Sequence, residues 1–165
     1  MGVGETIPEY PEYIAGLPRK RVAAGVLFRS ADGRVLLVEP SYKSNWEIPG
    51  GVVEADESPW AGATRELAEE LGTDRVVGRL LVVDHVHADD RRPDAMVFVF
   101  DGGVLDDAEV AALVFPDGEI LSAGLYTIDQ ARTLGKPMLA HRLTAALDAV
   151  REAAVVLCED GKRVA

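Results

Sequence analysis

The most informative segment of this chain is residues 51–73, which read GVVEADESPWAGATRELAEELGT. Ser58 is a favourable helix N-cap, and Pro59 suits the first helical position. Gly72 is well suited to end a helix, because glycine readily adopts the left-handed conformation. Between these signals lie about fourteen residues, close to four helical turns. The segment is therefore predicted to contain one well-defined helix.

Two faces of this predicted helix have opposite character. One face is apolar and repeats every three to four residues, which predicts packing against a sheet or another helix: Trp60, Ala63, Leu67 and Leu71. The other face groups the carboxylates of Glu66, Glu69 and Glu70, with no Lys or Arg three or four residues after Glu66. Like charges at this spacing destabilise an isolated helix by roughly 0.2–0.5 kcal/mol per pair. The acidic face therefore predicts a site for a hard divalent cation, since Mg²⁺ favours carboxylate oxygens.

The spacing of these residues resembles the Nudix box, G-x5-E-x7-R-E-U-x-E-E-x-G-U, in which U is aliphatic. The match begins at Gly51, passes through Glu57 and Arg65, and covers eight of the nine specified positions. Thr73 is the exception, at a packing position where little effect on chemistry is expected. Residues 46–54, WEIPGGVVE, resemble the W-x-L-P-G-G-x-x-E sequence that precedes the box in many members. Residues 55 and 56, Ala-Asp, stand where many members have a glycine, which is expected to alter the geometry of this loop and adds an acidic neighbour.

The resemblance covers roughly residues 20–155 and implies an α/β fold, a Nudix-type α/β/α sandwich with a mixed β-sheet between helices. Two regions follow: residues 1–19, with three prolines, as an extended N-terminal arm, and residues 20–165 as a single Nudix domain. Strands are expected from apolar and turn patterns at 20–29, 34–39, 46–48, 75–87, 95–101, 119–127 and 155–158. A short helix is expected after Thr127 or Asp129 and a second main helix at 138–154, whereas 104–118 is expected to be irregular.

The resemblance also implies roles for the acidic residues. Glu69 and Glu70 are expected to bind the metal directly, the carbonyl of Gly50 is expected to be a further ligand, and Glu66 is assigned either a second metal or the general base. Glu57 binds directly or through water in this interpretation. Arg65 would hold Glu57 with its guanidinium fork and so orient the helix. Glu119 is the expected outlying ligand or base.

The predicted activity is Mg²⁺-dependent hydrolysis, with Mn²⁺ as a substitute, of the diphosphate linkage in a nucleoside diphosphate joined to another moiety, such as a nucleotide sugar, an NTP or ADP-ribose. The alternative is a catalytically weak Nudix-fold module that senses a nucleotide, although the intact glutamates disfavour it. A prenyl diphosphate isomerase on this fold would need an additional catalytic cysteine, and Cys158 near the C-terminus does not suit that role.

Candidate substrate-binding residues lie outside the box. Trp46 and Phe98 are candidates for stacking on a base, although packing is the commoner role of such residues. Arg91 and Arg92 are candidates for phosphate contacts, and a solvated surface is the alternative interpretation. The sequence leaves open the identity of the substrate, the phosphorus that is attacked and the number of metals.

Composition sets the remaining expectations. The 165 residues carry a formal net charge of −11, which disfavours sequence-independent binding to nucleic acid or an anionic membrane. The single cysteine suits a reducing compartment. The N-terminus carries no apolar run typical of a signal peptide. The chain is thus expected to be cytoplasmic and to act on a small anionic nucleotide-like substrate, with a homodimer as an open possibility.

Overall fold

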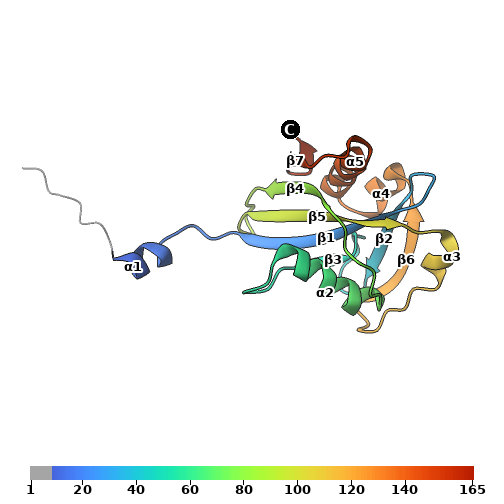
Figure 1. Cartoon of the computed structure of the whole chain (residues 1–165), viewed down its shortest axis with the longest axis horizontal. Coiled ribbons are helices and arrows are strands. Elements are labelled where there is room, and N and C mark those ends of the chain that lie inside the picture. Colours follow the sequence, from blue (N-terminus) through green and yellow to red (C-terminus); the bar gives the residue numbers. More distant parts are fainter. Residues whose placement is uncertain (1–8) are drawn as a thin grey trace, which may run out of the picture.

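The computed structural model describes residues 9–165, and its centre is a mixed eight-stranded sheet with helices on both faces (Figure 1). The strands run in the order β6-β2-β1-β5-β4-β7-β8, and β3 pairs with β1 beside this path. The pairs β1–β5 and β4–β7 are parallel, whereas the neighbouring pairs β1–β2, β2–β6 and β4–β5 are antiparallel. The predicted α/β sandwich with a mixed sheet is therefore confirmed.

The strands are β1 (Arg21–Arg29), β2 (Val35–Pro40), β3 (Gly50–Val52), β4 (Leu80–Val86), β5 (Ala95–Val104), β6 (Ile120–Tyr126), β7 (Val156–Glu159) and β8 (Lys162–Arg163). The helices are α1 (Tyr10–Ala15), α2 (Pro59–Leu71), α3 (Asp107–Ala111), α4 (Ile128–Leu134) and α5 (Pro137–Glu152). None of the helices within residues 9–165 has the length and apolarity needed to cross a membrane.

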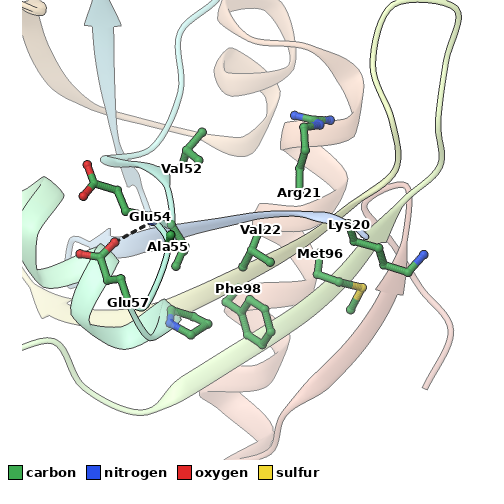
Figure 2. Close-up of a pocket in the computed structure, with 11 residues that line it drawn as sticks. Lys20, Arg21, Val22, Val52, Glu54, Ala55, Glu57, Met96 and Phe98 are labelled. Atoms are coloured by element: carbon green, nitrogen blue, oxygen red, sulfur yellow. Dashed lines mark hydrogen bonds between the residues drawn. The ribbon is translucent and has the colours of Figure 1, made fainter. Parts of the chain in front are cut away.

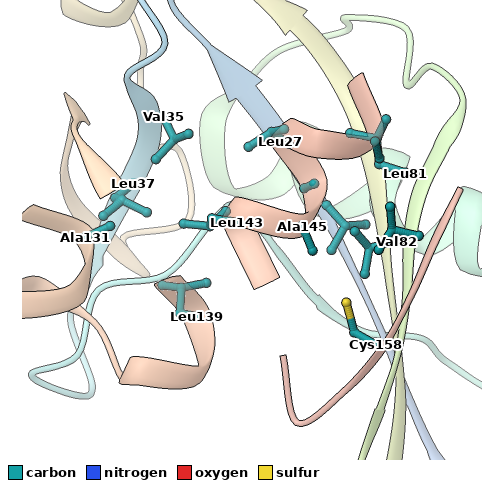
Figure 3. Close-up of a cluster of buried hydrophobic side chains, with 14 residues drawn as sticks. Leu27, Val35, Leu37, Leu81, Val82, Ala131, Leu139, Leu143, Ala145 and Cys158 are labelled. Carbon is teal, nitrogen blue, oxygen red and sulfur yellow. The ribbon is translucent and has the colours of Figure 1, made fainter. Parts of the chain in front are cut away.

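Each face of the sheet has its own apolar core. Leu143 of α5 and Ala131 of α4 are fully buried with Leu27 and Val35 in the core of one face (Figure 3). The core of the other face contains residues of α2 and α3 together with inward-facing residues of β1, β2 and β5. The sheet thereby fixes α2, which carries the acidic residues, on the face opposite α5.

The caps of α2 agree with the sequence. The Ser58 hydroxyl accepts a 3.1 Å hydrogen bond from the Ala61 amide, and Gly72 ends the helix with φ 57°. Of the predicted apolar stripe, Ala63, Leu67 and Leu71 are buried. The prediction is wrong for Trp60, which remains 47% exposed because its indole N–H donates to the Val77 carbonyl, on the segment that follows the helix.

Three predicted segments differ from the structure. The 104–118 stretch contains α3, whose N-terminus is fixed by a capping box between Asp106 and Glu109. The strand expected at 75–87 begins only at Leu80. The strand expected at 46–48 is reduced to one bridge between Val38 and Glu47, and pairing with β1 starts at Gly50.

The N-terminal arm is not simply extended. Residues 10–15 form α1, none of whose residues is buried, and Figure 1 shows this helix standing away from the body of the protein. The part of the arm predicted at 1–8 lies outside the described residues.

Candidate active site

Arg65 is the centre of the predicted acidic site. Its Nε and Nη2 donate to the two carboxylate oxygens of Glu57 at 2.9 and 3.0 Å, in a two-pronged arrangement. Its Nη1 donates to Glu66 at 2.9 Å and to Glu69 at 3.1 Å, and Nη2 also donates to the Val52 carbonyl. Because a guanidinium has five N–H groups, these five bonds use its full donor capacity. One arginine thus joins the loop before α2 to two glutamates on α2.

The carboxylates bound to Arg65 differ in their electrostatics. The hydrogen bonds from Arg65 lower the pKa of Glu57, with help from the Glu54 backbone N–H. Burial raises the pKa of Glu66 despite its bond to Arg65, and the negative charges of Glu69 and Glu119 act in the same direction. Glu57 is therefore a stable anion, whereas Glu66 lies in an environment that disfavours its charge.

Glu70 is the most unusual carboxylate of the site. It is 5% exposed, and its Oε2 accepts a 2.9 Å hydrogen bond from the Gly50 amide. Burial raises its pKa to about 8, and repulsion from Glu66, Asp117 and Glu119 adds to this effect, which the Gly50 N–H only partly opposes. Among residues 9–165, no Lys or Arg forms an ion pair with Glu70. The folded chain thus buries a carboxylate without the positive partner that would stabilise its charge.

Gly50 and Gly51 allow the backbone to approach these glutamates. A Cβ on Gly51 would lie 2.4 Å from Glu66 Oε1, and a Cβ on Gly50 would lie 2.2 Å from the Ala24 carbonyl oxygen. Gly50 also has φ +145°, which side chains rarely allow. Gly51 therefore permits the close contact of β3 with α2, and Gly50 permits the close contact of β3 with β1. The predicted role of the Gly50 carbonyl as a metal ligand remains a prediction, since the observed contact uses the amide.

The charge of Glu119 contributes to the raised pKa values of Glu66 and Glu70 on the acidic face of α2. Glu119 is exposed at the start of β6, and its carbonyl accepts a hydrogen bond from the Ser41 amide. The sequence interpretation missed Asp117, whose charge also acts on Glu70 and whose side chain accepts from the Glu119 amide. Its signal was the Asp-Gly-Glu turn at 117–119, directly before a strand.

The chemistry of this cluster fits a hard divalent cation. Its donors are carboxylate oxygens on one helix face, and Glu70 is buried without a cationic partner from residues 9–165. In the described part of the chain, no three His, Cys, Asp or Glu side chains already surround one point as metal ligands. Arg65 instead engages three of the carboxylates. Arg65 uses only Oε1 of Glu66 and only Oε2 of Glu69, so the second oxygen of each carboxylate is left for a bond to an ion.

The two aromatic candidates lie on different faces of the sheet. Trp46 packs edge-to-face against Tyr126, with ring centroids 5.3 Å apart, and contacts the core beneath α5. Phe98 lies on the α2 face and lines a pocket beside β1 and β3 (Figure 2). The structure thus gives each ring a packing role, and stacking on a substrate base stays a prediction for both.

Arg91 and Arg92 are not joined to the acidic site by any contact within residues 9–165. Both side chains are exposed, and their backbone amides donate to Asp89 Oδ1 to form the loop between β4 and β5. Their predicted contact with phosphates therefore stays a prediction.

Comparison with known proteins identifies the family. The model of the NUDIX domain matches residues 19–147. Diphosphoinositol polyphosphate phosphohydrolase 2 of Rattus norvegicus is 42% identical over 82 residues, which is 48% of this chain and 45% of that protein. This chain matches less than half the length of that curated relative.

Solved structures share the fold. The MutT protein of Methanosarcina mazei has a TM-score of 0.62 at 23% identity, covering 84% of this chain and 99% of that one. The NUDIX domain of Shewanella oneidensis NrtR, solved with ADP ribose, has a TM-score of 0.66 at 16% identity and covers 87% of this chain and 99% of that one. At these identities the likeness concerns the fold alone. Because the family model spans most of the sequence and the box glutamates converge on Arg65 and Gly50, this chain belongs to the Nudix family.

Proposed function

We propose that this protein is a divalent-metal-dependent hydrolase that cleaves the diphosphate linkage of a nucleoside diphosphate joined to another moiety. The observation that carries this proposal is Glu70, a buried carboxylate with a raised pKa and no cationic partner in the described chain. A side chain held in this state favours binding of a positive ion, because the ion offsets both burial and repulsion.

The residues divide into ligands and a positioning group. Glu69 and Glu70 would hold the ion, with Glu57, Glu66 and the Gly50 carbonyl as further candidates. The ion, Mg²⁺ in the first instance and Mn²⁺ as a substitute, would neutralise charge on the diphosphate and lower the pKa of the attacking water. Arg65 positions Glu57 on the loop relative to Glu66 and Glu69 on the helix. Glu66 and Glu119 remain the two candidates for the general base.

The substrate class follows from the shortage of free positive charge. The chain has a net charge of −11, and the arginine at the centre of the site already binds three carboxylates. A diphosphate neutralised by metal suits such a site better than an inositol carrying many phosphates, the substrate class in the name of the rat relative. ADP-ribose, which is bound in the Shewanella structure, and nucleotide sugars are therefore the first substrates to test.

The test is a product-resolved screen of ADP-ribose, nucleotide sugars, NTPs and a diphosphoinositol polyphosphate, each with Mg²⁺, with Mn²⁺ and with EDTA. Glu69→Gln and Glu70→Gln each remove a charge with little change in size. Glu152→Gln is the matched control, since Glu152 is a surface residue paired with Arg163. Metal-dependent turnover that survives in both site variants would contradict the assignment.

The second candidate is a nucleotide-sensing module with weak catalysis. Calorimetry on the same ligands separates the two functions, because a sensing module would bind a nucleotide without forming products under any metal condition. The proposal that nucleic acid is not a partner rests on the acidic composition, and the proposal of a cytoplasmic location rests on the single cysteine.

A further inference from the structure

Two histidines share one face at the end of β4. His85 and His87 are two positions apart on the strand, so their side chains point to the same side of the sheet. Their ring centroids lie 4.6 Å apart, and the side chains are 29% and 58% exposed, so a solute can reach both. No hydrogen bond or ion pair within residues 9–165 joins these rings to the carboxylates around Arg65. The histidine pair is therefore separate from the acidic site on α2.

Each ring contacts an aspartate from a different segment of the chain. His85 Nε2 lies 3.3 Å from Asp94 Oδ2, which directly precedes β5. His87 Nδ1 lies 2.9 Å from Asp160 Oδ2, in the turn between β7 and β8. This turn is held against β4 by two further bonds, because the His87 amide donates to Asp160 Oδ1 and the Asp160 amide donates to the His85 carbonyl. The fold thus fixes one nitrogen of each ring against a carboxylate.

The two aspartates select the tautomer of each ring. The bonds from Lys20 and His85 lower the pKa of Asp94, and the bond from the His87 amide lowers the pKa of Asp160, so both carboxylates are anions. Because an ionised carboxylate only accepts, each neutral ring carries its proton on the nitrogen that faces the aspartate. The lone pairs of His85 Nδ1 and His87 Nε2 make no hydrogen bond to the described part of the chain. A histidine that donates its other N–H to a carboxylate is the usual form of a metal ligand.

We propose that His85 Nδ1 and His87 Nε2 bind a divalent transition-metal ion, Zn²⁺ in the first instance, at a site separate from the box. Imidazole suits such an ion, whereas the box carboxylates suit Mg²⁺. Rings whose centroids are 4.6 Å apart can share one ion that lies about 2.0–2.1 Å from a nitrogen of each. Within residues 9–165 no three side chains already surround one point as ligands, so water completes the coordination. Glu159 is the candidate for a third protein ligand, because it is exposed and lies in register with His85 on β7.

The experiment titrates Zn²⁺ into the full chain by calorimetry. His85→Gln with His87→Gln removes both ring nitrogens and should raise the Zn²⁺ dissociation constant of this site by at least roughly 100-fold, since loss of even an outer partner costs about 10–100-fold. His141→Gln is the matched control, because His141 is the third histidine of the chain and lies on α5, where binding should be unchanged. Glu69→Gln with Glu70→Gln removes any Zn²⁺ that binds at the box, and one Zn²⁺ per chain is expected to remain in that variant.

Two further measurements test the role of the aspartates. Asp160→Asn removes the charge that orients His87 but keeps a residue that tolerates the left-handed backbone, at φ 48°, so the dissociation constant should rise by about tenfold. Nuclear magnetic resonance of the rings should place the ion on His85 Nδ1 and His87 Nε2.

The proposal would be overturned by a wild-type chain that binds no Zn²⁺ over the micromolar range, or by binding that persists in the double histidine variant. It would also be overturned by an ion on the ring nitrogens that face the aspartates. Circular dichroism checks that each variant is folded, which is expected because none of the changed histidines is buried.

Discussion

Two buried carboxylates on opposite faces of the sheet have opposite electrostatic surroundings. Asp84 of β4, with 0% exposure, receives a 2.6 Å hydrogen bond from Arg142 of α5 and further bonds from the Gly161 amide to both of its oxygens. Glu70 of α2, with 5% exposure, receives one bond from the Gly50 amide and is surrounded by negative charge. The two side chains are buried to nearly the same extent, so they differ in the groups that donate hydrogen bonds to them and in the charges around them.

This difference separates a structural carboxylate from a binding one. The Asp84 group ties α5 and the C-terminal hairpin to the sheet, and its charge is compensated inside the fold. No cationic side chain within residues 9–165 pairs with Glu70, so a bound ion would supply the missing positive charge. Removing the Asp84 carboxylate should therefore reduce stability, whereas removing the Glu70 carboxylate should reduce activity without reducing stability.

The largest effect is expected for Asp84→Ala. The change leaves the largely buried Arg142 without its carboxylate, and breaking a buried pair in this way costs about 3–5 kcal/mol of unfolding free energy. Urea denaturation measures the loss. Asp148→Ala is the control, because its pair with the exposed Arg151 on the surface should contribute less than about 1 kcal/mol. Equal losses in the two variants would contradict the structural role of Asp84.

Glu70→Gln should lower metal-dependent turnover by at least roughly 100-fold, since loss of even an outer partner of a metal ligand costs about 10–100-fold. In the absence of metal, the same variant should be at least as stable as wild type at neutral pH, because the change removes the cost of keeping this buried carboxyl protonated above its usual pKa. Turnover assays and urea denaturation in EDTA measure the two effects. If Glu70→Gln lowered the unfolding free energy in EDTA, the Glu70 carboxylate would be structural, as Asp84 is.

The pH dependence of stability should sharpen the comparison further. Because the pKa of Glu70 rises from 4.5 to about 8 on folding, the folded chain holds this proton more tightly than the unfolded chain. This tighter proton binding stabilises the folded chain fully below about pH 4.5, and the stabilisation is lost as the pH rises towards 8. The unfolding free energy should fall with a slope of at most about 1.4 kcal/mol per pH unit for one proton. Denaturation of metal-free wild type and Glu70→Gln across this range measures it. If the unfolding free energies of wild type and Glu70→Gln changed in parallel with pH, a contribution from Glu70 titration would be excluded.

The smallest effect is expected for Arg65→Lys, which keeps the charge but removes the two-pronged bond to Glu57. Turnover should fall by about tenfold, since the residue positions ligands and does not contact substrate in this proposal. Arg34→Lys is the control, because Arg34 makes a similar fork to Asp107 on the surface. If Arg65→Lys lowered turnover no more than Arg34→Lys does, a positioning role for Arg65 would be contradicted.

Much of the site was predictable because its signals are local. Ser58, Pro59 and Gly72 define the ends of α2, and spacing alone places Glu66, Glu69 and Glu70 on one face. The pairing of Arg65 with Glu57 was predicted from the resemblance to the Nudix box. Trp60 follows the same spacing but escapes the core, because the segment after α2 supplies a hydrogen-bond partner that helical periodicity does not contain.

Contacts between distant segments were not predictable from one sequence. Asp84 and Arg142 are 58 residues apart, and nothing in either local sequence shows that they meet. The same holds for Asp117, whose effect on Glu70 depends on the approach of the β6 loop to α2. The α1 helix was missed because its three neighbouring prolines favour extended chain, although Pro11 is tolerated in the first turn.

The sequence alone therefore determined the helix, its acidic face and the family, because caps, periodicity and the box spacing are properties of neighbouring residues. Only the tertiary structure decided which carboxylates are compensated. Charge compensation depends on burial and on partners that the fold brings together from distant segments: Arg142 is brought to Asp84, whereas Glu70 receives only the Gly50 amide.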